Sequence, residues 1–147
     1  MPSFASNCFY RFATVTLLVC AGCGSTSTPA TTAAKTITVT ETEYSIALSP
    51  SVIAAGDIVF ASHNGGALEH EMVVFKTDLA PDKMPVKADG TVDENGAGVT
   101  HIDPEIPEFG GGTSASATLH LAAGKYAVLC NVGNHYSKGM RTALTVQ

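Results

Sequence analysis

The chain has 147 residues, a formal net charge of −5, and 13 acidic against 8 basic residues. This length fits one domain, and the lack of a basic stripe argues against a nucleic-acid partner. The acidic residues gather between Asp78 and Glu108, which favours a partner protein with a basic docking face.

Residues 1–22 predict an export signal. Arg11 is the only charge there, and residues 12–19 form an apolar stretch too short to span a membrane comfortably. The small residues before Cys23 resemble the end of a bacterial lipoprotein signal. That resemblance implies a lipidated Cys23, which would anchor the chain on the outer face of the cell membrane. Such signals usually have an aliphatic residue where this chain has Cys20. Ordinary cleavage nearby is the alternative, and it would leave a periplasmic or secreted protein.

Residues 23–34 predict a flexible tether of mostly Ser, Thr and Ala, because they contain no charge and no large apolar group. The folded domain is then 35–147, which is large enough to bury a core. Cys130 is the only cysteine of that domain, so it has no partner for an internal disulfide. By itself a lone cysteine is more often an inert buried residue. Together with His135 and Met140 at their spacings it favours a metal ligand, because coordination protects an exported thiol from oxidation.

Short apolar runs, several of them alternating with polar residues, predict a series of β-strands separated by Gly and Pro turns. The runs are 37–40, 44–48, 58–61, 72–75, 116–121, 125–130 and 140–146. No sustained helical period occurs among them. The sequence therefore predicts an all-β sandwich. Residues 77–112 are rich in Pro, Gly, Asp and Glu, and they predict a long irregular excursion that carries little core, with a short helix or turn near 81–84.

Four side chains predict a metal site. Cys130, His135 and Met140 follow the spacing Cys-x4-His-x4-Met, and His70 stands directly before the predicted strand 72–75. Two imidazoles, a thiolate and a distant thioether are the donor set of a blue-copper site. Three of these donors share one loop and His70 comes from elsewhere, so copper affinity depends on the fold. We also expect loop N–H groups, such as that of Asn131, to hydrogen-bond the sulfur.

Other titratable residues are predicted to lie outside this site. His63, His101 and His120 have no partner at ligand spacing. Glu69 and Glu71 flank His70, where a carboxylate close to copper would favour Cu(II) and could compete with the thioether. We expect both carboxylates to point away from the metal.

The domain resembles the cupredoxins, the blue-copper family of plastocyanin, azurin, rusticyanin and sulfocyanin. The resemblance spans about 36–147 and is carried by segments 55–65, 70–75 and 121–140. The four-residue gaps on both sides of His135 are most similar to those of rusticyanin and sulfocyanin. Related loops often have Pro-Gly where this chain has Gly-Asn at 133–134.

The resemblance implies a Greek-key β-sandwich with one copper ion. It implies that His70, Cys130 and His135 are the equatorial ligands and that Met140 is the long axial ligand. In such proteins the loop histidine lies near the surface and serves as the electron port, a role that here would fall to His135.

The expected function is an exported electron carrier that exchanges single electrons with a redox protein donor and acceptor, for example those of a respiratory chain or an oxidase. We expect a monomer. We expect no catalysis, because copper oxidases use several such domains and His-x-His pairs, whereas this chain has one domain and no such pair. The alternative is a copper-binding module for copper storage, delivery or sensing. The low methionine count, four in all, disfavours it.

Overall fold

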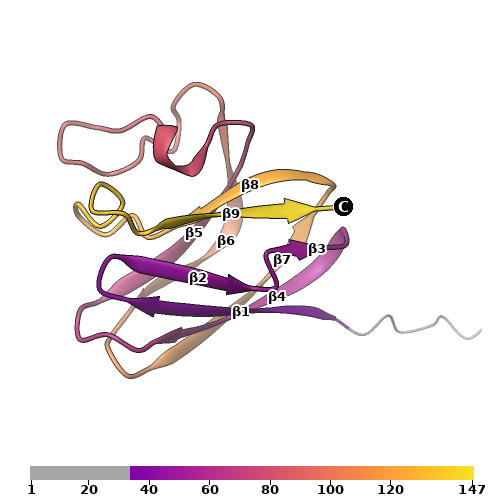
Figure 1. Ribbon diagram of the computed structural model, residues 1–147, viewed down its shortest axis with the longest axis horizontal. Helices are drawn as coiled ribbons and strands as arrows, with labels where there is room; N and C mark the ends of the chain where they lie inside the picture. Colours follow the sequence, from indigo (N-terminus) through magenta and orange to yellow (C-terminus); the bar gives the residue numbers. More distant parts are fainter. Residues whose placement is uncertain (1–33) are drawn as a thin grey trace, which may run out of the picture. The chain divides into compact units, whose positions relative to one another are not determined.

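The computed structural model describes residues 34–147, which form two facing β-sheets (Figure 1). One sheet has the order β2-β1-β4-β7 and the other the order β3-β9-β8-β5-β6. The first sheet consists of β2 (Ser45–Ser49), β1 (Lys35–Thr42), β4 (Gly56–Asn64) and β7 (Ser114–Leu121). The second consists of β3 (Val52–Ile53), β9 (Arg141–Val146), β8 (Gly124–Leu129), β5 (His70–Thr77) and β6 (Val99–Phe109). The predicted all-β sandwich is confirmed.

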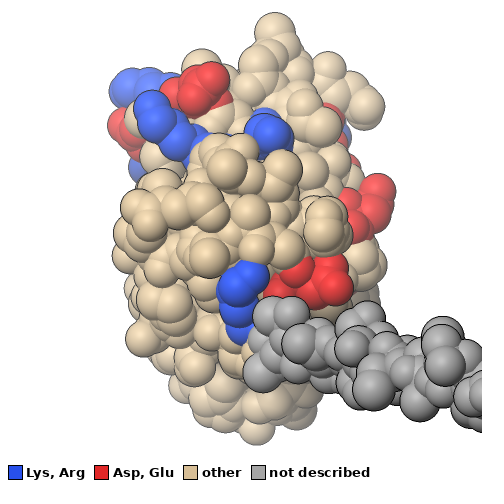
Figure 2. All heavy atoms as spheres, turned by 90° about the vertical axis from the view of Figure 1, so that its right-hand side faces the viewer, with Lys and Arg blue, Asp and Glu red and all other residues tan. Residues whose placement is uncertain are grey.

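The predicted export signal, 1–22, lies outside the described residues, as does the tether, 23–34, except for its last residue. The division of the chain into signal, tether and domain therefore stays a prediction. In the part of the chain that the structure describes, no helix has the length and apolar character needed to cross a membrane. Figure 2 shows a face with scattered charges of both signs among uncharged residues, and no basic stripe crosses it.

The main core lies between the two sheets, and we call it the inner cluster. Strand β1 alternates strictly, burying Ile37 and Val39 and then, unexpectedly, Glu41. Inward-facing apolar residues of the opposite sheet, such as Met72 and Val128, pack against them. The alternation of apolar and polar residues in the sequence therefore predicts which side chains of β1 enter this core, because alternate side chains of a strand point to the same face.

A second core covers the outer face of strands β5 and β8, and we call it the outer cluster. It consists of Val73, Phe75, Met84, Val92, Ala127, Leu129 and Tyr136. Met84 and Val92 come from the segment between β5 and β6, which includes the short 3₁₀ helix η1 (Pro81–Lys83). The short helix is confirmed, but the expectation that this region carries little core is wrong.

Strand β6 also corrects the prediction that 77–112 is irregular. It spans 11 residues and pairs only with β5, at the edge of its sheet. Its sequence contains Pro104 and Pro107, which an edge strand tolerates because half of its N–H groups need no ladder partner. The pairing register shifts twice, between His70 and Met72 and again before Val74. These shifts remove the regular alternation on which the sequence prediction relied.

Candidate metal centre

His70 is the first residue of β5, and the Asn64 side chain holds the loop that leads to it. The Asn64 amide donates to the carbonyls of Leu68 (2.8 Å) and Phe109 (3.1 Å), and its oxygen accepts from the Gly66 N–H (3.0 Å). One buried side chain thereby fixes the loop between β4 and β5 and joins it to the end of β6. His70 enters the sandwich from a braced position and is fully buried.

The loop between β8 and β9, residues 130–140, carries the other three predicted ligands, and we call it the ligand loop. Its ends are tied together, because the Cys130 N–H donates to the Met140 carbonyl at 3.1 Å. The Met140 N–H donates in turn to the His135 carbonyl at 3.1 Å. Gly133 and Gly139 have φ angles of 47° and 117°, in the region that glycine enters without steric cost. The loop therefore folds back on itself at these two glycines.

The structure brings three of the four predicted ligands together at one buried point. The Nδ1 atoms of His70 and His135 lie 3.3 Å apart, and the Cys130 sulfur lies 3.4 Å from Nδ1 of His135 and 3.9 Å from Nδ1 of His70. Among the described residues, these three form the group whose donor atoms all lie within 4.8 Å of one another. Met140 is fully buried in the inner cluster, which also contains Cys130.

The protonation states of the three donors suit a metal. Burial lowers the pKa of both imidazoles. Lys138 lowers the pKa of His135 further, and the two rings lie so close that a proton on His135 would lower the pKa of His70. Both rings are therefore neutral at pH 7 and have a free lone pair, which metal ligation requires. Burial raises the pKa of the Cys130 thiol to about 11, so a bound cation must displace its proton.

Two backbone N–H groups hydrogen-bond the Cys130 sulfur and partly offset the effect of burial on its pKa. They belong to Glu71 and Val132. The expectation that loop N–H groups bond the sulfur holds for Val132, whereas the Asn131 N–H bonds the Glu71 carboxylate. Such bonds stabilise a thiolate and tune a metal bound to it. The buried donors and these sulfur contacts fit a thiolate-bound copper ion.

The flanking carboxylates do not join the three donors. Glu69 is exposed, whereas Glu71 is half-buried and bonded to the Asn131 backbone. Burial and the nearby Glu105 and Glu108 raise the pKa of Glu71 to about 7. No carboxylate belongs to the metal-ligating group found among residues 34–147.

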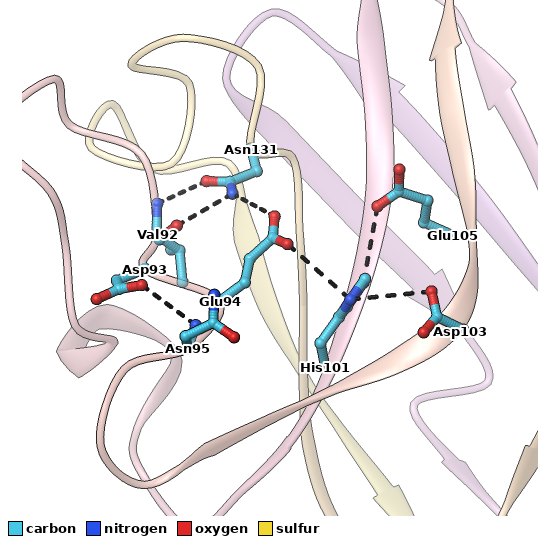
Figure 3. A network of polar contacts seen from close by, with 8 residues as sticks. All are labelled: Val92, Asp93, Glu94, Asn95, His101, Asp103, Glu105 and Asn131. Carbon is cyan, nitrogen blue, oxygen red and sulfur yellow. Dashed lines mark hydrogen bonds and ion pairs between the residues drawn. The ribbon is translucent and has the colours of Figure 1, made fainter.

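The remaining histidines lie elsewhere. His63 contacts Ser114 and His120 pairs with Asp57, all at the surface. His101, on β6, lies within 4.0 Å of three carboxylates, as Figure 3 shows: those of Asp103 and Glu105 on the same strand and that of Glu94 before it.

Two neighbours of the site left no signal in the sequence. The Tyr44 ring stands edge-on to His135, with centroids 5.2 Å apart, and the Lys138 Nζ atom lies 4.2 Å from the centre of the Tyr44 ring. Tyr44 sits in the β1–β2 turn with a φ of 61°, which is uncommon for a residue other than glycine.

Glu41 is the second such neighbour. It is buried between the sheets, where one carboxylate oxygen accepts from Ser62 at 2.6 Å and the other has no partner.

Comparison with known proteins decides the family. Residues 10–147 match the copper binding proteins of the plastocyanin/azurin family. The chain belongs to this family. The cupredoxin resemblance seen in the sequence is therefore confirmed. The family, its structural neighbours and the His-Cys-His group agree on one copper ion as the cofactor.

Solved cupredoxins share the fold at low sequence identity. Auracyanin B is 19% identical with a TM-score of 0.55, covering 78% of this chain and 89% of that chain. Dithionite-reduced auracyanin from Roseiflexus castenholzii is 20% identical with a TM-score of 0.56, covering 79% and 99%. Auracyanin A from Chloroflexus aurantiacus is 21% identical with a TM-score of 0.50, covering 76% and 98%. No curated protein is significantly similar to this chain in sequence.

Proposed function

We propose that the protein is a blue-copper electron carrier in which His70, Cys130, His135 and Met140 hold the metal. The observation that carries the proposal is the convergence of two neutral imidazoles and one thiol at a buried point. When bound, copper supplies one-electron chemistry by cycling between Cu(I) and Cu(II). Thiolate and thioether suit the cuprous ion and imidazole suits both, so this donor set accepts either state.

The surrounding residues keep the donors in place during that cycle. Cys130 directly follows β8, His70 begins β5, and these two strands pair over four residues. The Glu71 and Val132 N–H groups orient the sulfur, and the tied ends of the ligand loop hold His135 and Met140. A frame that stays the same in both oxidation states lowers the cost of electron transfer, because little has to reorganise.

His135 is the candidate electron port. It retains 9% of its surface exposed, whereas His70 and Cys130 have none. The half-buried Tyr44 ring contacts His135 edge-on. Partner redox proteins would therefore dock at this end of the sandwich, with this chain acting as a monomer between a donor and an acceptor.

We propose an extracytoplasmic location for this carrier. Support comes from the signal-like residues 1–22 and from the lone thiol of the domain, which a metal would protect. Lipidation of Cys23 would anchor the carrier to the outer face of the membrane. Mass spectrometry of the exported protein tests this directly, because a diacylated N-terminal cysteine and an unmodified N-terminus differ greatly in mass.

The proposal excludes a role in copper storage or delivery, which needs donors that release the metal readily. The three converging donors here are buried, so copper should leave slowly. Rapid loss of copper to a weak chelator would favour the storage or delivery role instead.

A single substitution tests the ligand assignment. Cys130→Ser keeps the size of the side chain but removes the thiolate, so the copper-loaded variant should show no intense blue absorption. His63→Ala, which changes an exposed histidine of β4, is the matched control and should keep the band. A blue band in the Cys130→Ser protein would overturn the assignment.

A further inference from the structure

The segment between β5 and β6, residues 78–98, contacts the ligand loop, and we call it the cap segment. In Figure 1 it lies at the same end of the sandwich as the loop between β8 and β9. Asn131, the residue after Cys130, pairs with the backbone of Val92 in both directions (Figure 3). Its side-chain oxygen accepts from the Val92 N–H at 2.6 Å, and its amide donates to the Val92 carbonyl at 3.2 Å. The same amide donates to Glu94 at 3.0 Å.

Tyr136, the residue after His135, makes a second connection. Its hydroxyl donates to the Pro81 carbonyl at 2.9 Å and accepts from the Met84 N–H at 3.1 Å. Its ring is 4% exposed and packs in the outer cluster with Met84 and Val92. The Tyr136 hydroxyl is a hydrogen-bond partner for both the Pro81 carbonyl and the Met84 N–H. Tyr136 and the cap segment therefore stabilise each other.

A third contact shows how closely the two segments approach. The Ser137 hydroxyl donates to the Gly90 carbonyl at 2.8 Å. A Cβ atom at Gly90 would lie 3.1 Å from that hydroxyl and 3.4 Å from Cβ of Asn134, and the φ of Gly90 is +87°. Only glycine fits this position without strain, so the backbone at Gly90 is built for close contact with the ligand loop.

The cap segment has internal restraints of its own. Val86 and Val92 form an antiparallel bridge, and N–H groups of Lys87 and Asp93 donate to carbonyls across the same turn at 2.8 Å. At its base, the Thr77 hydroxyl donates to the Gly98 carbonyl at 2.7 Å and accepts from the Leu79 N–H at 3.0 Å. The Val86–Val92 bridge therefore braces the part of the segment that bonds Asn131, whereas the Thr77 bonds join only the two ends of the segment, at Leu79 and Gly98.

We propose that the cap segment holds the ligand loop in its metal-binding conformation before copper arrives, and that Asn131 and Tyr136 are the positioning residues through which it acts. The inference rests on the proposed electron-carrier function. The loop has Gly133-Asn134 and no proline, so its own covalent structure restrains it little. Contacts from the cap segment would make the ligand loop rigid, and a site that keeps the same geometry with Cu(I) and Cu(II) requires such rigidity.

Amide hydrogen exchange in the copper-free protein tests this restraint without any metal. Tyr136→Phe removes both hydroxyl contacts but keeps the ring, so exchange at the His135, Gly139 and Met140 amides should rise about five- to tenfold. Thr77→Val is the matched control, because it removes a hydroxyl that also donates to one carbonyl and accepts from one N–H of the cap segment. It should leave the ligand-loop amides within about twofold of the original protein.

Asn131→Ala is a second test by amide exchange in the copper-free protein, because it removes the side-chain bonds to Val92 and Glu94. Asn134→Ala, which changes an exposed residue of the same loop, is its control. Faster loop exchange in Asn131→Ala alone supports the proposal. Unchanged loop exchange in both Tyr136→Phe and Asn131→Ala, or equal changes in Tyr136→Phe and Thr77→Val, would overturn it.

The copper-loaded proteins show whether the restraint matters for electron transfer. Electron self-exchange, measured by NMR line broadening, should slow about fivefold or more in Tyr136→Phe and stay unchanged in Thr77→Val. Equal self-exchange rates in the two variants would reduce the cap segment to a structural role. A failure of the unaltered protein to form a blue copper site would instead refute the proposed function, and the copper-free exchange data would still decide whether the restraint exists.

Discussion

The inner and outer clusters meet at the ligand loop, and they contribute different things to it. Cys130 and Met140 belong to the inner cluster, between the sheets, whereas Tyr136 belongs to the outer cluster, beneath the cap segment. The inner cluster thus contains two of the proposed metal donors, and the outer cluster supplies contacts to the other side of the loop. The conformation of the ligand loop therefore depends on both clusters, of which only the inner one lies between the sheets.

The comparison predicts that damage to the inner cluster destabilises the whole domain. Phe60 is fully buried there, on β4. Phe60→Ala should lower the free energy of unfolding by about 3–5 kcal/mol, because a large cavity replaces well-packed atoms. Urea unfolding of the copper-free protein measures this loss. A loss below about 1 kcal/mol would mean that this core is not close-packed.

The buried carboxyl of the inner cluster should make stability depend on pH. Burial raises the pKa of Glu41 from 4.5 to about 7, and the bond from Ser62 opposes this only in part. The folded domain therefore binds this proton more tightly than the unfolded chain. The resulting stability is fully present below about pH 4.5 and is lost as the pH rises to about 7, a change of about 3 kcal/mol at most.

Glu41→Gln should remove that part of the pH dependence. Urea unfolding of both copper-free proteins between pH 4 and 8 gives the comparison. Glu71, whose pKa is also raised to about 7, is present in both proteins. Its charge raises the pKa of Glu41, so the difference between the two curves reports Glu41 together with its coupling to Glu71. Parallel curves would show that the Glu41 carboxyl is not buried in the folded protein.

Damage to the outer cluster should remain local. Met84 belongs to the cap segment, is 5% exposed, and packs in the outer cluster. Met84→Ala should loosen that segment by about 2 kcal/mol, which is roughly thirtyfold in amide exchange at Lys87, Gly90 and Asp93. Amides of β1 and β4 should be unaffected. Uniformly faster exchange across both sheets would show that the two clusters unfold as one unit.

The smallest effect is expected at the surface, away from both clusters. His120 and Asp57 form an ion pair at 2.7 Å with most of each side chain exposed. His120→Ala should change the free energy of unfolding by less than about 0.5 kcal/mol, because solvent screens such pairs. A loss above about 1 kcal/mol in thermal or urea unfolding would mean that surface electrostatics contribute as much as the outer cluster.

The inner cluster and the donor set were predictable because their signals are local. Strict alternation marks β1 and β4, and the fixed gaps between Cys130, His135 and Met140 depend only on the loop. Alternation did not reveal Glu41, because a carboxyl at an inward position looks like any polar residue at the end of a strand. Its burial depends on the opposite sheet, which one strand's sequence does not encode.

The outer cluster could not be predicted for a different reason. Strand β6 contains two prolines and pairs through register shifts, so its period is broken. Asn131 and Tyr136 bond to backbone groups of a segment about 40 to 55 residues earlier, and backbone partners leave no residue pattern. Contacts of this kind emerge only from the folded chain.

Addition of Cu(II) to the purified protein, followed by its visible spectrum and reduction potential, tests the central claim most directly. The account predicts an intense blue band that saturates at one copper per chain, with a high and reversible potential. A colourless or red complex of low potential would contradict it. That result would point to a carboxylate-modified site or to copper handling, and Glu69 and Glu71 would then be the first residues to replace.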